Sequence, residues 1–166
     1  MLLSELLRGL PYPTKEEILA EPTKHKREII KLTKAWKKEV WNEARQSNPS
    51  DKFEALKNLL DAIAFAYNKP VTIEFVPDTP IGCHYKPTDH TIVIDAHVSI
   101  ISALHELAHH LFGDSELKAC RWSVWLFKKV FPRAYAKLVW NQHMLIKPTC
   151  PTQQIESISD STISSE

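Results

Sequence analysis

Glycine is scarce in this chain: only Gly9, Gly82 and Gly113 occur among its 166 residues. Tight hairpin turns and phosphate-binding loops need residues with positive φ, and glycine adopts such values at the lowest cost. Three glycines are too few for an all-β sandwich or a glycine-rich nucleotide-binding fold. We therefore expect a mainly helical chain with few tight turns, and its length suits one compact domain.

The composition excludes several other classes of protein. Lys and Arg number 21 against 20 Asp and Glu, and this net charge of +1 does not draw the whole chain to nucleic acid or anionic membrane. The three cysteines are odd in number and form no CxxC pair, which argues against a disulfide framework. Glu5 and Arg8 interrupt the apolar N-terminus, and no apolar run approaches the ~20 residues of a membrane span. We expect a cytoplasmic protein without a signal peptide, a transmembrane segment or a membrane partner.

Apolar residues recur at helical spacing over most of the chain. This spacing predicts helices at residues 2–9, 14–20, 23–46, 51–67, 98–112, 114–131 and 132–146. Thr14 and Thr23 are the expected caps of the second and third helices, and Asp51 is the expected start of the fourth. The tail 148–166 is polar, rich in Ser and Thr, and aperiodic, which predicts disorder.

A β-branched stretch interrupts these helices. It predicts short strands at residues 71–76, 82–85 and 91–95, in a small, mostly antiparallel three-stranded sheet. Helices, then a sheet, then helices is the order of an α+β fold. We expect a single domain over residues 1–147, with a helical part at 1–68 followed by the sheet and its adjoining helices at 71–131.

Residues 105–109 read His-Glu-Leu-Ala-His, an HExxH pattern within a predicted helix. Residues four apart lie one turn apart on one helix face, so His105 and His109 can bind one metal ion while Glu106 lies beside it. Two histidines with a carboxylate favour zinc, and we expect one Zn²⁺ per chain. The alternative is that both histidines are polar neighbours on a buried helix, because residues such as Leu104 and Leu107 already form a core stripe.

A catalytic zinc needs a third protein ligand. The metzincin pattern HExxHxxGxxH would require Gly and His at the positions of Phe112 and Ser115, so that class is excluded. Glu116 begins the next predicted helix, behind a turn at Gly113, and is the favoured ligand. Its alternative role is to complement the helix dipole. Asp114 is the rival ligand, with a helix cap as its alternative role.

The stretch 71–132 resembles the ImmA/IrrE-type minimal gluzincin metallopeptidases. The matching residues are Gly82, Tyr85, Ile92 and Ile94 of a G-x-Y…I-x-I hairpin, then the segments 105–111 (HELAHHL) and 116–119 (ELKA), and Pro132. The resemblance implies a zincin-like fold in which His105, His109 and Glu116 bind zinc and Glu106 is the catalytic base. Cys120 departs from the family, which usually has Asp or Asn there to support a ligand histidine.

These residues predict hydrolysis of a peptide bond. Bound zinc lowers the pKa of water towards ~7, Glu106 takes the proton, and the resulting hydroxide attacks a carbonyl. Tyr85 is the candidate donor to the oxyanion, and the strand at 91–95 is the expected edge for an extended substrate. We expect a zinc metallopeptidase that cleaves a specific intracellular protein, such as a transcriptional regulator or repressor.

A basic segment suggests a different function. Residues 23–46 carry eight Lys or Arg against three Glu, with Trp36 and Trp41 between them, so contact with nucleic acid is conceivable. A solvated helix face with its tryptophans in the core is the favoured interpretation. The alternative functions are a non-catalytic, zinc-stabilised DNA- or protein-binding module that uses this helix, and an SprT-like nucleic-acid-linked protease. The chain lacks the Cys₄ ribbon that is frequent among SprT-like enzymes.

Overall fold

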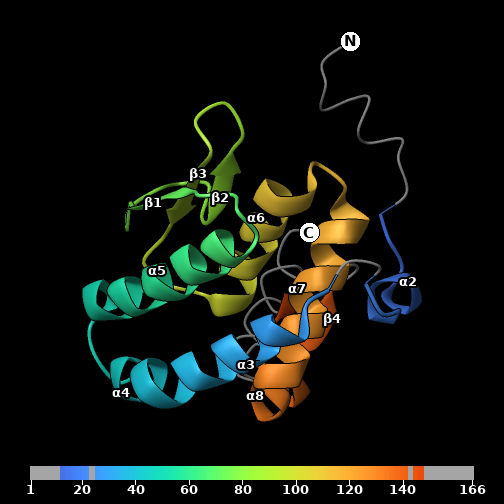
Figure 1. Cartoon of the computed structure of the whole chain (residues 1–166), viewed down its shortest axis with the longest axis horizontal. Coiled ribbons are helices and arrows are strands. Elements are labelled where there is room, and N and C mark those ends of the chain that lie inside the picture. Colours follow the sequence, from blue (N-terminus) through green and yellow to red (C-terminus); the bar gives the residue numbers. More distant parts are fainter. Residues whose placement is uncertain (1–11, 23–24, 142–143, 148–166) are drawn as a thin grey trace, which may run out of the picture.

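The computed structural model describes residues 12–22, 25–141 and 144–147 (Figure 1). The helix expected at 2–9 and the tail at 148–166 lie outside these residues. In chain order the elements are α2 (Lys15–Leu19), α3 (Arg27–Trp36), η1 (Lys37–Trp41), α4 (Asn42–Ala44), α5 (Pro49–Ala66), β1 (Thr72–Phe75), β2 (His84–Lys86), β3 (Thr91–Ile94), α6 (Ile100–Phe112), α7 (Glu116–Val130), α8 (Pro132–Lys137), β4 (Val139–Asn141) and β5 (Met144–Ile146). Helices dominate beside a small sheet, which confirms the predicted α+β class. In the described part of the chain no helix has the length and apolar character needed to cross a membrane.

Short polar side chains set several helix starts. The Thr14 hydroxyl accepts a hydrogen bond from the Glu17 N–H at the start of α2, as predicted. Helix α5 begins earlier than expected because Asn48, rather than Asp51, caps it, and Pro49 supplies a favourable first residue. Thr23, the expected cap of the basic helix, lies outside the described residues.

The basic helix changes type along its length. It continues from α3 through the π-helical turn η1 into α4. Trp36 is buried, stacks on Trp41 with ring centroids 5.3 Å apart, and donates its indole N–H to the Ala55 carbonyl at 2.7 Å. Trp36 therefore anchors this helix to α5.

The three-stranded sheet has the order β1–β3–β2. Strand β2 pairs antiparallel with β3, whereas β1 pairs parallel with β3, so the sheet is mixed rather than mostly antiparallel. All four residues of β3 are buried, and a strand so apolar is stabilised best at the centre of a sheet. The expectation that residues 91–95 form an open edge for substrate was therefore wrong, because both edges of β3 are paired. Strand β2 forms an edge instead.

One hydrophobic core joins the N-terminal helices to the sheet and to the helices that follow it. Its fully buried members include Ile29 of α3, Leu56 of α5, Ile92 of β3, Leu104 of α6 and Leu126 of α7. Helices α6 and α7 therefore share one hydrophobic core with the sheet, beside which α6 lies (Figure 1). Packing in this core holds the end of α6 in position relative to the start of α7.

The C-terminal helix predicted at 132–146 was wrong beyond Lys137. Helix α8 ends there, Leu138 is extended, and β4 pairs antiparallel with β5. Trp140 and Leu145 of this hairpin pack on a cluster that contains Ile18 of α2 and Val124 of α7. These tertiary contacts outweigh the helical spacing of the segment.

Gly113 ends α6 with φ 99° and ψ −164°, which confirms the predicted positive φ. No heavy atom lies within 4 Å of a Cβ built at this position, so strain there comes from the backbone alone. We expect Gly113→Val to lower the free energy of unfolding by about 1–3 kcal/mol in urea denaturation, because other residues rarely adopt this conformation. The control is Asp114→Val at the next residue, which is exposed and has no positive φ. Equal losses of unfolding free energy in Gly113→Val and Asp114→Val would contradict the conclusion that the positive φ at Gly113 causes the strain.

Candidate metal centre

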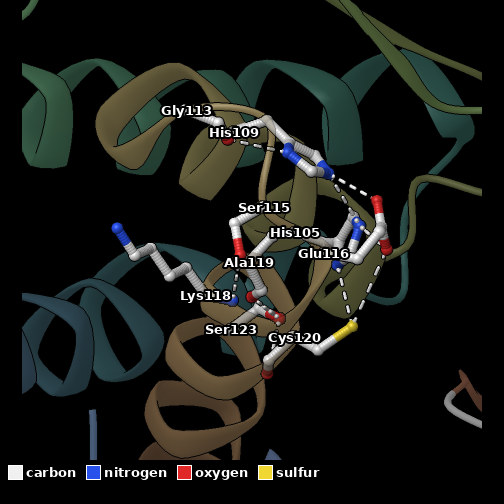
Figure 2. Close-up of polar contacts among 9 residues, drawn as sticks. All are labelled: His105, His109, Gly113, Ser115, Glu116, Lys118, Ala119, Cys120 and Ser123. Atoms are coloured by element: carbon white, nitrogen blue, oxygen red, sulfur yellow. Dashed lines mark hydrogen bonds and ion pairs between the residues drawn. The ribbon is translucent and has the colours of Figure 1, made fainter. Parts of the chain in front are cut away.

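Two helices bring three potential metal ligands together at the junction of α6 and α7 (Figure 2). His105 and His109 lie one turn apart on α6, and their Nε2 atoms are 3.2 Å apart. Glu116, the first residue of α7, places Oε1 2.8 Å from His109 Nε2 and Oε2 3.3 Å from His105 Nε2. The ligand atoms of the three residues all lie within 4.8 Å of one another. We call these three residues the donor group.

The spacing of the donor group fits a small metal ion. Two ligand atoms that each lie ~2.1 Å from a tetrahedral zinc are about 3.4 Å apart. The two imidazole Nε2 atoms, 3.2 Å apart, are close to that value, and Glu116 brings one carboxylate oxygen to 2.8 Å from His109 and the other to 3.3 Å from His105. Two imidazoles and a carboxylate are also a known ligand set for catalytic zinc. The residues present therefore fit zinc.

A backbone contact fixes the orientation of the His109 ring. Its Nδ1 lies 3.0 Å from the Gly113 carbonyl oxygen, which can only accept a hydrogen bond (Figure 2). Nδ1 therefore carries a proton, and in the neutral ring Nε2 directs a lone pair at Glu116. A metal-binding histidine commonly donates its second N–H to a carbonyl in this way.

Glu116 gives the donor group a negative charge, which a proton on an imidazole or a bound cation can balance. Hydrogen bonds from His105 and His109 hold the pKa of Glu116 well below its usual range, so Glu116 is a carboxylate. Burial lowers the pKa of His109, but hydrogen bonds to Glu116 and to Gly113 outweigh it and leave that pKa raised. A lone pair facing a carboxylate at 2.8 Å is repulsive unless positive charge lies between them.

Glu106 lies in the same cleft and remains outside the donor group. Burial raises the pKa of its carboxyl group, while the neighbouring His105 and His109 lower it. A carboxylate whose pKa moves towards neutrality is a suitable proton acceptor near pH 7.

Cys120 lies behind the donor group. Its sulfur is 3.7 Å from His105 Nδ1 and 3.9 Å from Glu116 Oε2 (Figure 2). Burial raises the pKa of the thiol to about 12, so the group is neutral. The structure therefore places a neutral thiol against His105 and Glu116.

Two other sequence candidates lie elsewhere. The Tyr85 hydroxyl is 3.0 Å from His90 Nδ1 and 2.9 Å from His110 Nδ1, and Tyr85 does not line the cleft. The structure therefore does not bring the expected oxyanion donor to the donor group. Asp114 is exposed in the turn, and Ser115, rather than Asp114, caps α7.

Two members of the donor group, His105 and Glu116, line a cleft of about 180 Å³ together with Glu106. Met144 and Leu145 of β5 also line this cleft. Sequence reasoning missed these two residues because it predicted a helix there, although Val139 and Trp140 are residue types that favour strands. Larger hollows of about 380 and 390 Å³ lie elsewhere and contain no part of the donor group.

Comparisons of the chain with protein-family models, with curated proteins and with solved structures found no match. The resemblance to minimal gluzincin peptidases therefore stays a prediction from the sequence motifs.

Proposed function

We propose that this protein is a zinc-dependent metallopeptidase that hydrolyses a peptide bond in a specific cytoplasmic protein, such as a transcriptional regulator. The observation that carries this proposal is the convergence of His105, His109 and Glu116 beside Glu106. The HExxH pattern supplies two metal-binding histidines, His105 and His109, and a proton acceptor, Glu106. Glu116 supplies the third metal ligand, and the fold brings it next to the two histidines.

Each polar residue at the site has a separate role in the proposed reaction. Zinc, when bound to the donor group, supplies a Lewis acid that polarises a carbonyl and lowers the pKa of water. Glu106 holds the proton taken from the attacking water and returns it to the leaving amine. The Gly113 carbonyl keeps the His109 ring in one orientation, and Cys120 supports His105 and Glu116 from behind.

An extended peptide has a backbone edge available close to the cleft. Strand β2 is an edge of the sheet, and Cys83, which directly precedes it, lines the cleft together with Glu106. An unpaired strand edge can hold an extended peptide through main-chain hydrogen bonds. We therefore propose β2, rather than the central β3, as the substrate-binding strand.

The basic helix carries no second proposal. Trp36, one of the two tryptophans that suggested base stacking, is buried and bonded to α5. Lys26 and Lys37 donate to carbonyl groups of α5 and α7 at 3.2 and 2.9 Å. Several features that suggested nucleic-acid contact therefore have a role in packing.

Metal binding and cleavage test the proposal together. We expect one zinc per chain in purified protein by metal analysis, or uptake of one equivalent in a titration. We also expect cleavage of a protein that accumulates in cells carrying Glu106→Gln. Protein that neither contains nor takes up zinc would refute the proposal.

The thiol of Cys120 gives a second measurable effect on metal binding. We expect Cys120→Ala to weaken zinc binding about tenfold or more in a competition titration, because loss of a group that supports a metal ligand costs ~10–100-fold. Cys120→Asp should restore or strengthen binding, since a carboxylate accepts the His105 N–H more strongly. Cys83→Ala is the matched control, because Cys83 lines the same cleft and is not bonded to the donor group. Equal affinities of wild type and Cys120→Ala would contradict a supporting role.

A further inference from the structure

We infer that the hairpin β4–β5 forms, with α6 and α7, an apolar pocket beside the donor group, and that the substrate places an aliphatic side chain of leucine or methionine size in it. This inference rests on the proposed function, because it names the substrate class of the same site. It concerns the apolar part of the cleft lining.

Aliphatic side chains from three elements line this part of the cleft. They are Ile101 of α6, Val124 of α7, and Met144 and Leu145 of β5. In the part of the chain that the structure describes, no Lys, Arg or aromatic residue lines the cleft, and its only carboxylates are Glu106 and Glu116. A substrate side chain bound in this part of the cleft would therefore contact mainly apolar side chains.

The buried hydroxyl in these walls already has a hydrogen-bond partner within the protein. The Ser123 hydroxyl lies 2.7 Å from the Ala119 carbonyl, to which it donates. The Cys83 and Cys120 side chains also line the cleft, and a cysteine behaves as a small, weakly polar side chain. A negatively charged side chain would lose its hydration here without gaining a partner of opposite charge, because the described residues that line the cleft include no Lys or Arg. An aliphatic side chain would instead gain from burial.

The hairpin is held firmly enough to act as a wall. Trp140 and Leu145 pack on the apolar cluster that includes Ile18 and Val124, and the Lys15 ammonium lies 5.9 Å from the centre of the Trp140 ring. Met144 remains 57% exposed, so its side chain is accessible at the rim. Contacts with α2 and α7 thus position β5, while the cleft side stays open to a ligand.

The volume sets the size of the side chain. The whole cleft, including the part beside the ligands, has a volume of about 180 Å³, slightly more than an engineered ~150 Å³ cavity that binds benzene. A leucine or methionine side chain fits such a space, and the walls of β5 and α7 would touch it on two sides.

Two peptide hydroxamates test the pocket without requiring catalysis. Both chelate zinc through the same group, and they differ only in an isobutyl or a carboxyethyl side chain next to it. With the full-length, zinc-loaded chain, we expect calorimetry to show at least about tenfold tighter binding of the isobutyl compound. Equal affinities, or tighter binding of the carboxyethyl compound, would overturn the inference and leave the proposed metal centre intact.

A substitution on the hairpin assigns the preference to β5. Met144→Arg should lower the preference for the isobutyl over the carboxyethyl compound by about tenfold, because it adds a cation at the rim that attracts the carboxylate. Val139→Arg is the matched control: it lies on the same hairpin, is also exposed and does not line the cleft, so the ratio should remain unchanged. An unchanged ratio in Met144→Arg would overturn the role of the hairpin. A chain that takes up no zinc would refute the proposed function and this inference together.

Discussion

Replacement of Glu106 by Gln is expected to slow peptide-bond hydrolysis by roughly 10²- to 10⁴-fold, the range attributed to a positioned general acid–base. The amide keeps the shape of the side chain but cannot accept the proton. Glu106 lies outside the donor group, so zinc content should stay at the wild-type level. Single-turnover cleavage at saturating enzyme, with zinc measured in the same sample, gives both quantities.

The control for this substitution is Glu54→Gln, which makes the same chemical change at an exposed position of α5. It should cleave substrate at the wild-type rate. If Glu106→Gln with bound zinc cleaves substrate as fast as Glu54→Gln does, Glu106 is not the proton acceptor and the proposed mechanism fails.

Removal of the Glu116 carboxylate should have the largest effect on metal binding. If three ligands share an apparent binding free energy of ~12 kcal/mol about equally, loss of one costs ~4 kcal/mol, or about a thousandfold in affinity. Glu116→Ala should show this loss in a competition titration with a chelator of known affinity. Its oxygens at 2.8 and 3.3 Å from the two imidazoles are the geometric basis of the expectation.

Asp114→Ala is the matched control because Asp114 is the rival carboxylate of the same turn and lies outside the donor group. Its zinc affinity should equal that of the wild type. A large loss in Asp114→Ala together with none in Glu116→Ala would transfer the third ligand to Asp114 and contradict the geometry.

Patterns that depend on neighbouring residues were predicted well. Thr14 begins α2 as expected, because a cap is a contact between residues three apart. Gly113 has the positive φ that its place at the end of a helix indicated. The spacing of His105 and His109 also placed the two side chains on one face of α6, because helix geometry puts residues four apart one turn from each other.

Features that depend on distant contacts were not predicted. The parallel pairing of β1 with β3 reflects the burial of β3 among helices from both halves of the chain. The hairpin at 139–146 exists where a helix was expected, because Trp140 and Leu145 find partners on α2 and α7. The hydroxyl of Tyr85 contacts His90 and His110 rather than the donor group. Sequence spacing does not specify which of these partners Tyr85 meets.

The sequence by itself determined the α+β class and nominated His105, Glu106, His109 and Glu116, since these depend on composition, periodicity and positions within a turn or two. Only the tertiary structure decided that Glu116, rather than Asp114, reaches both imidazoles, and that Cys120 lies against them. It also decided that β5 contributes side chains to the lining of the cleft. The physical reason is that side chains from separate elements meet only after the shared core has fixed the distance and angle between those elements.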